Sequence, residues 1–83
     1  METKKEMIQS IFADNNISVR DVVKKSAQIE GEKDYGITYP TVLKIINGKK
    51  VTLSTMTRFI RAFNAILVSQ GKEMVSSSIF IVE

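Results

Sequence analysis

The side chains of this chain that could do chemistry are lysines, arginines, hydroxyls and amides. The sequence contains neither histidine nor cysteine, which removes the commonest zinc ligand, the thiolate ligands and the commonest general base. A conventional metalloenzyme or triad hydrolase is therefore disfavoured. We expect no catalytic residue, no metal site and no cofactor, so the chemistry that remains is reversible binding.

The basic side chains are unevenly distributed along the sequence. Residues 1–34 hold six basic and seven acidic side chains, whereas residues 35–72 hold six basic side chains and no acidic one. An acid-free segment of this length produces a positive field over part of the surface, as nucleic-acid binders need. The alternative is that a net charge of +3 is ordinary solubility charge for a small domain.

The stretch 37–50 concentrates cations and hydroxyls around one predicted helix. Its apolar residues recur at i, i+3 and i+4 and so share one face, which holds Val42, Ile45 and Ile46. The opposite face carries Pro40, Lys44 and Asn47. Gly48 is expected to end the helix, and Lys49 and Lys50 follow without an acid to neutralise them. We expect an anionic partner on this polar side.

Three further helices must position this one, over residues 4–14, 19–30 and 53–69. Each shows apolar residues at helical spacing. Thr3 and Ser18 are expected N-caps, because each is followed three residues later by an acidic residue. The polar segment from Glu30 to Gly36, which contains two glycines and lacks periodicity, is expected to be a loop.

The start of the central helix has two interpretations. Thr38 is a good N-cap residue, but Pro40 disfavours helical geometry at Tyr39. Tyr39 could therefore equally be the cap, with Pro40 at the first helical position. Either choice leaves Thr41 and Lys44 pointing outward.

The last residues of the chain, 74–82, are rich in β-branched and aromatic side chains and predict a β-strand. Both faces of this strand are apolar near its end, so it must pair with something. We expect it to pair with its symmetry mate in a homodimer and to bury Ile79, Phe80 and Ile81. The alternative is that it folds back on the helix over residues 53–69.

At 83 residues the chain can form one modest core. We expect residues 1–72 to form that domain and residues 73–83 to be a dimerisation element. The N-terminus lacks the apolar run of a signal peptide, and no window approaches the roughly 20 apolar residues of a membrane span. We therefore expect a cytoplasmic protein that has no membrane partner.

The run from Ile37 to Lys49 resembles the recognition-helix segment of the Cro/repressor-type helix-turn-helix family, often called Xre-like. The shared features are the small polar residues before an apolar pair one helical turn apart, and the Asn-Gly-Lys ending at residues 47–49. The resemblance extends from Ser18 to about Asn64. It implies an all-α, lambda-repressor-like fold of four to five helices, to which this chain adds the C-terminal β-strand.

The sequence departs from this family at two places. Family members join their second and third helices by a tight turn of about four residues, whereas this chain has the longer segment between Ala27 and Gly36. Insertions in surface loops cost little closure entropy, and this loop could contact either DNA or a protein. Val19 stands where many members carry a glutamine that contacts phosphate, and Arg20 could substitute for it.

The resemblance also implies which residues bind duplex DNA. A helix fits the major groove, and side chains near its N-terminus reach base edges. The residues at base-contacting positions are Tyr39, Pro40 and Lys44. Lys44 could donate to guanine O6 and N7, and Tyr39 or Pro40 could pack on a thymine methyl. The residues that fit phosphate contacts are Thr38, Thr41, Asn47, Lys49, Lys50 and Arg58.

These assignments predict a sequence-specific transcriptional repressor of the phage or mobile-element type, which occupies an operator as a homodimer. Two other functions fit the same fold. An antitoxin would bind DNA and neutralise a toxin through its appended C-terminal segment. A protein-interaction module would have lost DNA binding altogether.

Overall fold

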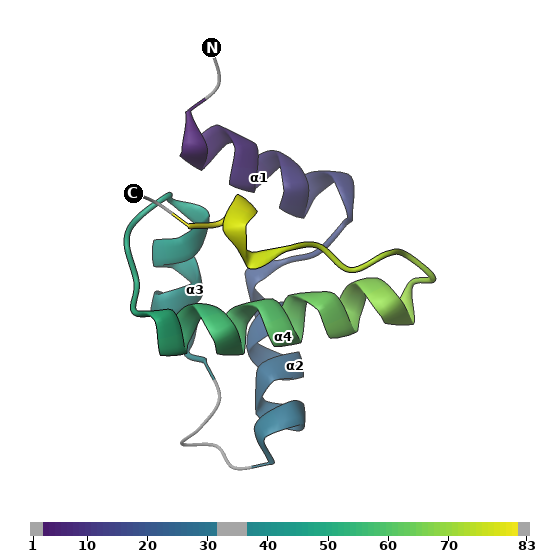
Figure 1. Cartoon of the computed structure of the whole chain (residues 1–83). Coiled ribbons are helices and arrows are strands. Elements are labelled where there is room, and N and C mark those ends of the chain that lie inside the picture. Colours follow the sequence, from purple (N-terminus) through teal and green to yellow (C-terminus); the bar gives the residue numbers. More distant parts are fainter. Residues whose placement is uncertain (1–2, 32–36, 82–83) are drawn as a thin grey trace.

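The computed structural model describes residues 3–31 and 37–81, apart from the side chain of Glu30. In these ranges the chain forms α1 (Lys4–Asp14), α2 (Val19–Glu30), α3 (Tyr39–Ile46), α4 (Leu53–Ser69) and a short 3₁₀ turn, η1 (Ser77–Ile79). The long helix α4 crosses the molecule, with α1 on one side of it, most of α2 on the other, and α3 beside its N-terminal end (Figure 1). This arrangement fits the helical part of the predicted fold, but not its C-terminal β-strand. No helix in the described ranges has the length and apolar character needed to cross a membrane.

The helix boundaries follow from local capping chemistry. Thr3 accepts a hydrogen bond from the backbone N–H of Glu6 at 3.1 Å. Ser18 and Asp21 form a reciprocal capping box, in which the Asp21 carboxylate accepts from Ser18 N–H at 2.9 Å. At the other end of α1, Asn16 adopts the left-handed conformation, with a φ of 55°. The predicted N-caps Thr3 and Ser18 are therefore confirmed.

The core lies where α4 meets α2, α1 and the C-terminal segment. Its buried apolar residues are Ile8, Phe12, Ile17, Val22, Ile37, Val42, Ile45, Met56, Phe59, Ala62, Phe63, Ile66, Leu67 and Phe80. All four phenylalanines of the sequence are in this list. Their ring centroids lie between 4.8 and 6.0 Å apart in the contacting pairs, the range of favourable aromatic packing.

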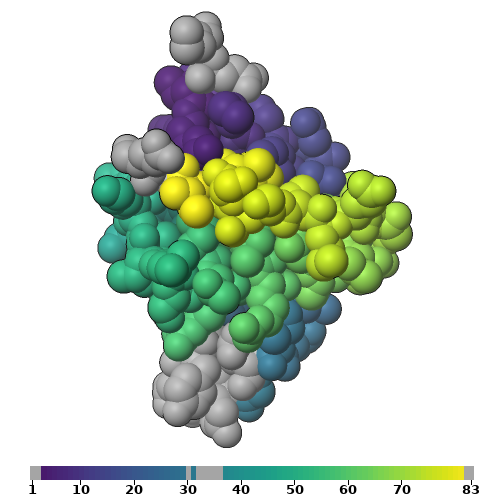
Figure 2. Space-filling model, viewed as in Figure 1, coloured from purple at the N-terminus to yellow at the C-terminus, as the bar shows by residue number. Residues whose placement is uncertain are grey.

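The predicted C-terminal β-strand is wrong, because no residue up to 81 in the described C-terminal segment is in a strand. Residues 72–76 instead run back along α4 and lead into η1 (Figure 1). Figure 2 shows this segment as a yellow band between α1 and α4. Phe80 is 1% exposed and packs edge-on against Phe59 and Phe63, with centroid distances of 4.8 and 5.3 Å. The segment thus folds back on its own chain, the alternative considered above.

The side chain of Asn64 makes backbone hydrogen bonds that a partner strand would otherwise make. The Asn64 amide donates to the carbonyl of Val75 at 3.0 Å, and its side-chain oxygen accepts from Val75 N–H at 2.8 Å. These two bonds satisfy the backbone groups that a neighbouring strand would otherwise pair. The backbone of Val75 therefore needs no second strand.

We predict that Phe80→Ala lowers the free energy of unfolding by about 3–5 kcal/mol, because it empties a closed aromatic site. Urea unfolding of dilute protein measures this loss. Met74→Ala is the control, because Met74 is 67% exposed in the same segment and its removal should change stability by at most about 0.5 kcal/mol. A loss that occurs only at high protein concentration would instead place Phe80 between two copies.

Candidate nucleic-acid interface

The start of α3 resolves the two interpretations of its cap. Thr38 is the N-cap in extended conformation, and Tyr39 and Pro40 are the first two helical residues. The Thr38 hydroxyl lies 2.8 Å from the Thr41 hydroxyl and makes no hydrogen bond to a first-turn N–H. The first turn of α3 therefore keeps N–H groups without a side-chain cap, which can face an anion.

A buried serine holds the approach to α3. Ser26, on α2, is 1% exposed, and its hydroxyl accepts a 2.9 Å hydrogen bond from the backbone N–H of Ile37. Ile37 is itself buried in the core. The chain is thus fixed to α2 two residues before α3 begins, although residues 32–36 of the predicted long loop lie outside the described ranges.

The end of α3 is set by a glycine that touches α1. Gly48 has a φ of +73°, and Lys49 N–H donates to the carbonyl of Lys44 at 2.9 Å, while Gly48 N–H donates to that of Ile45 at 3.0 Å. This pair of bonds is a Schellman motif. A Cβ at position 48 would meet the backbone nitrogen of Lys5 at 3.1 Å. Both the backbone conformation and the close approach require glycine here.

Five of the nine predicted DNA contacts meet in two adjacent grooves on the α3 side of the molecule. A groove of about 430 Å³ is lined by Thr41, Lys44 and Lys50. The N-cap of α4, Thr52, and Thr55 in its first turn line the same groove. Thr38, Thr41 and Arg58 line a smaller groove of about 190 Å³. The two grooves have Thr41 and Thr55 in common, so they form one continuous surface between α3 and the start of α4.

The other predicted contacts lie around this surface. Tyr39 is 45% exposed, and Pro40 and Asn47 are exposed as the second residue and the C-cap of α3. Lys49 is exposed in the connection to α4 and lines a third groove together with Lys50. The base-contact and phosphate-contact roles of these residues stay predictions.

Two helix N-termini give this surface an additional positive potential. The first turns of α1 and α2 carry Glu6 and Asp21, whereas the first turns of α3 and α4 carry no acidic residue. An uncompensated helix N-terminus acts as roughly half a positive charge. The partial charges of α3 and α4 therefore add to those of Lys44 and Lys50 beside them.

The sequence did not point to Thr55, which lines both grooves. Its N–H donates to the Thr52 hydroxyl at 3.2 Å, and its own hydroxyl accepts from Thr52 at 2.9 Å. The available signal was a hydroxyl in the first turn of a helix that begins three residues after a pair of lysines. Such a residue can donate to a phosphate at the same place as the helix N-terminus.

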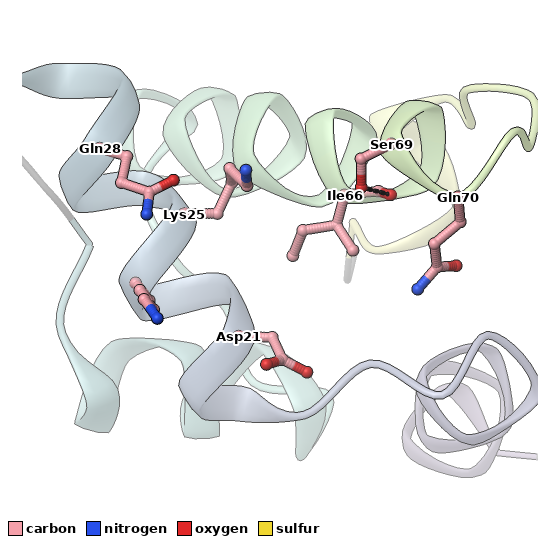
Figure 3. A pocket seen from close by; sticks show the side chains of 7 residues that line it. Asp21, Lys25, Gln28, Ile66, Ser69 and Gln70 are labelled. Atoms are coloured by element: carbon pink, nitrogen blue, oxygen red, sulfur yellow. Dashed lines mark hydrogen bonds between the residues drawn. The ribbon is translucent and has the colours of Figure 1, made fainter.

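A separate polar groove of about 320 Å³ lies between α2 and α4 (Figure 3). Asp21, Lys25 and Gln28 of α2 face Ser69 and Gln70 at the end of α4. Asp21 is already engaged in the cap of α2, and an acidic side chain at this groove opposes an anionic ligand. The groove therefore differs in character from the surface beside α3, where none of the described lining residues is acidic.

The packing of α2 and α3 against each other and the exposed polar side of α3 are typical of a helix-turn-helix nucleic-acid-binding domain. The chain belongs to the family of Cro/C1-type HTH DNA-binding domains, which it matches over residues 7–65. This match runs from α1 almost to the end of α4, further in both directions than the resemblance noted in the sequence. No curated protein and no solved structure matches the chain significantly.

We predict that Gly48→Ala is more destabilising than Gly71→Ala by about 1 kcal/mol or more. Both alanines would adopt a left-handed conformation, which costs about 1–2 kcal/mol, but only the one at position 48 meets the backbone of α1. A Cβ on Gly71, with a φ of +75°, meets nothing within 4 Å.

Thermal unfolding of the two variants measures the difference, because about 1 kcal/mol shifts the midpoint of a domain this size by roughly 4–8 °C. Equal midpoints would show that α1 does not constrain the end of α3.

Proposed function

We propose that this chain is a transcriptional repressor of the phage or mobile-element type, which acts by occupying its operator as a dimer. The observation that carries the proposal is the continuous surface between α3 and α4, whose described lining residues include lysines and an arginine but no acid, on a chain that belongs to a DNA-binding family. No catalytic step is required, since occupation of the operator itself blocks transcription.

The exposed side of α3 supplies the proposed sequence reading. Lys44 is exposed in the last turn of this eight-residue helix, and a lysine in the major groove can donate to guanine O6 and N7. Tyr39 and Pro40, exposed in the first turn, can pack on a thymine methyl. These three residues are the proposed base contacts.

The phosphate contacts are proposed to surround the reading helix. Such contacts fix register and orientation but carry no sequence information. Thr38 is the N-cap of α3, and Arg58 of α4 lines the same groove as Thr38. Lys49 and Lys50 follow the end of α3. Thr41 and Asn47 complete the predicted set. Because contacts lie at both ends of α3, they would fix its angle in the groove.

A dimer is proposed because one short helix reads few base pairs. Helix-turn-helix proteins commonly bind palindromic sites with half-sites about one helical turn apart, and the symmetry of the protein matches that of the site. The sequence predicted a dimer contact made by Ile79, Phe80 and Ile81 within a β-strand. The described residues of this segment form no strand, and Phe80 is buried in its own chain. Of the three, Ile81 is 40% exposed and stays available.

We predict that the protein retards a duplex from the region upstream of its own coding sequence in a mobility-shift titration. The affinity should fall with salt at a log–log slope of about −0.9 for each phosphate contact that is neutralised. Titrations at two salt concentrations measure the slope. An absence of retardation at low salt would refute the DNA-binding proposal.

We predict different effects for two lysines of the interface. Lys44→Ala should cost about 1–3 kcal/mol on the preferred site and relax selectivity at one base pair, because it removes a base contact. Lys49→Ala should weaken all sequences about equally and reduce the salt slope by about 0.9. Titrations with the preferred duplex and with single-base variants separate these results.

Lys24→Ala is the matched control for both variants. It makes the same change in net charge, but Lys24 lies in the polar groove between α2 and α4. If it weakens binding as much as Lys49→Ala does, the effect of Lys49 is one of net charge and not of a phosphate contact.

A further inference from the structure

The exposed side of α3 carries two large apolar side chains beside its polar ones. Tyr39 is 45% exposed and Leu43 is 36% exposed. The two residues are four positions apart and therefore lie next to each other on one face of the helix. Neither belongs to the core of the described chain or to the partly buried apolar residues that pack against it. This pair, which we call the apolar row, therefore faces solvent.

The apolar row and the basic grooves occupy different halves of the exposed side of α3. At roughly 100° per residue, Leu43 lies about 40° around the helix from Tyr39, whereas Lys44 lies about 140° from it. Lys44 and Thr41 line grooves together with residues of α4, and the described lining of these grooves includes neither member of the apolar row. The exposed side thus has a basic half beside the start of α4 and an apolar half along its other edge.

A partner of this surface must match both halves. The cations and the two uncompensated helix N-termini favour a polyanion, and the apolar row favours one that also presents apolar groups. In the major groove of duplex DNA, the apolar group on the base edges is the C5 methyl of thymine. Because the chain belongs to a DNA-binding family and both halves lie on one eight-residue helix, this methyl is the group that fits.

We propose that Leu43 is a specificity-determining residue that packs on the C5 methyl of a thymine, and that Tyr39 packs on a second methyl in the same half-site. The row is about 6 Å long, because α3 rises about 1.5 Å per residue. Stacked bases are about 3.4 Å apart along a strand, so the two methyls would lie within about two base-pair steps of each other. The inference deepens the proposed function and rests on it for duplex DNA as the partner.

Replacement of thymine by uracil tests this proposal on the unaltered chain. Uracil pairs with adenine and keeps the O4 acceptor, but it lacks the C5 methyl. The probe is a duplex that the full chain selects from a random-sequence pool, so the test does not depend on the upstream region. We expect the all-uracil form of this duplex to bind about fourfold more weakly for each methyl that is read, which is the value of one buried methylene.

Two variants assign the methyl contact to a residue. Leu43→Ala should bind the thymine duplex about fourfold more weakly or worse, and its loss on uracil substitution should be smaller by about the same factor. The leucine and the methyl would share one contact, so their effects are not additive. Val68→Ala is the control, because Val68 is 56% exposed in the last turn of α4, and it should leave the affinity and the uracil effect unchanged.

The outcomes that overturn the proposal are distinct from a failure of the repressor proposal. Equal affinities for the thymine and uracil duplexes exclude methyl reading, and a uracil effect that Leu43→Ala leaves unchanged excludes Leu43 as the reader. If the pool yields no bound duplex, both this inference and the DNA-binding proposal fail. If the selected duplex behaves as expected but no upstream duplex is retarded, the methyl contact stands and only the proposed regulation of the upstream region fails.

Discussion

The packing of four phenylalanine rings is the interaction on which the rest of the structure depends. Phe12 of α1 and Phe80 of the C-terminal segment both contact Phe59 and Phe63 of α4. The cluster therefore joins three parts of the chain that are far apart in sequence. A chain of this size buries only roughly 60–65% of its unfolded surface, so large rings supply much of the available burial. With α4 fixed by the rings, α2 can pack along it and carry α3.

The position of α3 follows from this framework, because an eight-residue helix is too short to be stable alone. Val42 and Ile45 bury one face of it in the core. Ser26 holds the chain before the helix, and Gly48 allows the chain after it to lie against α1. The opposite face is consequently presented to solvent in a defined orientation. The helix that is proposed to read DNA is thus held along one side by the core, before its start by α2 and after its end by α1.

The sequence predicts those parts of the fold that local interactions decide. Capping at Thr3 and at Ser18 depends on an acidic residue three positions later, and it is visible as spacing. The C-terminal segment could not be predicted in this way. Its β-branched residues favour a strand, but Phe80 and the Asn64 bonds to Val75 decide its conformation, and both are long-range contacts. The grouping of the candidate site around Thr55 could not be predicted from the sequence either, because residues of α3 and α4 come together only in the folded chain.

The absence of acidic residues from 35–72 affects more than the count of charges. It leaves the N-termini of α3 and α4 uncompensated, while Glu6 and Asp21 compensate those of α1 and α2. Side-chain and backbone charges of one sign are thus placed on the same surface, although the whole chain carries only +3. This arrangement costs self-repulsion in the free protein. An anion that spans α3 and the start of α4 would relieve the repulsion, so the same charges that weaken the isolated surface favour a polyanionic partner.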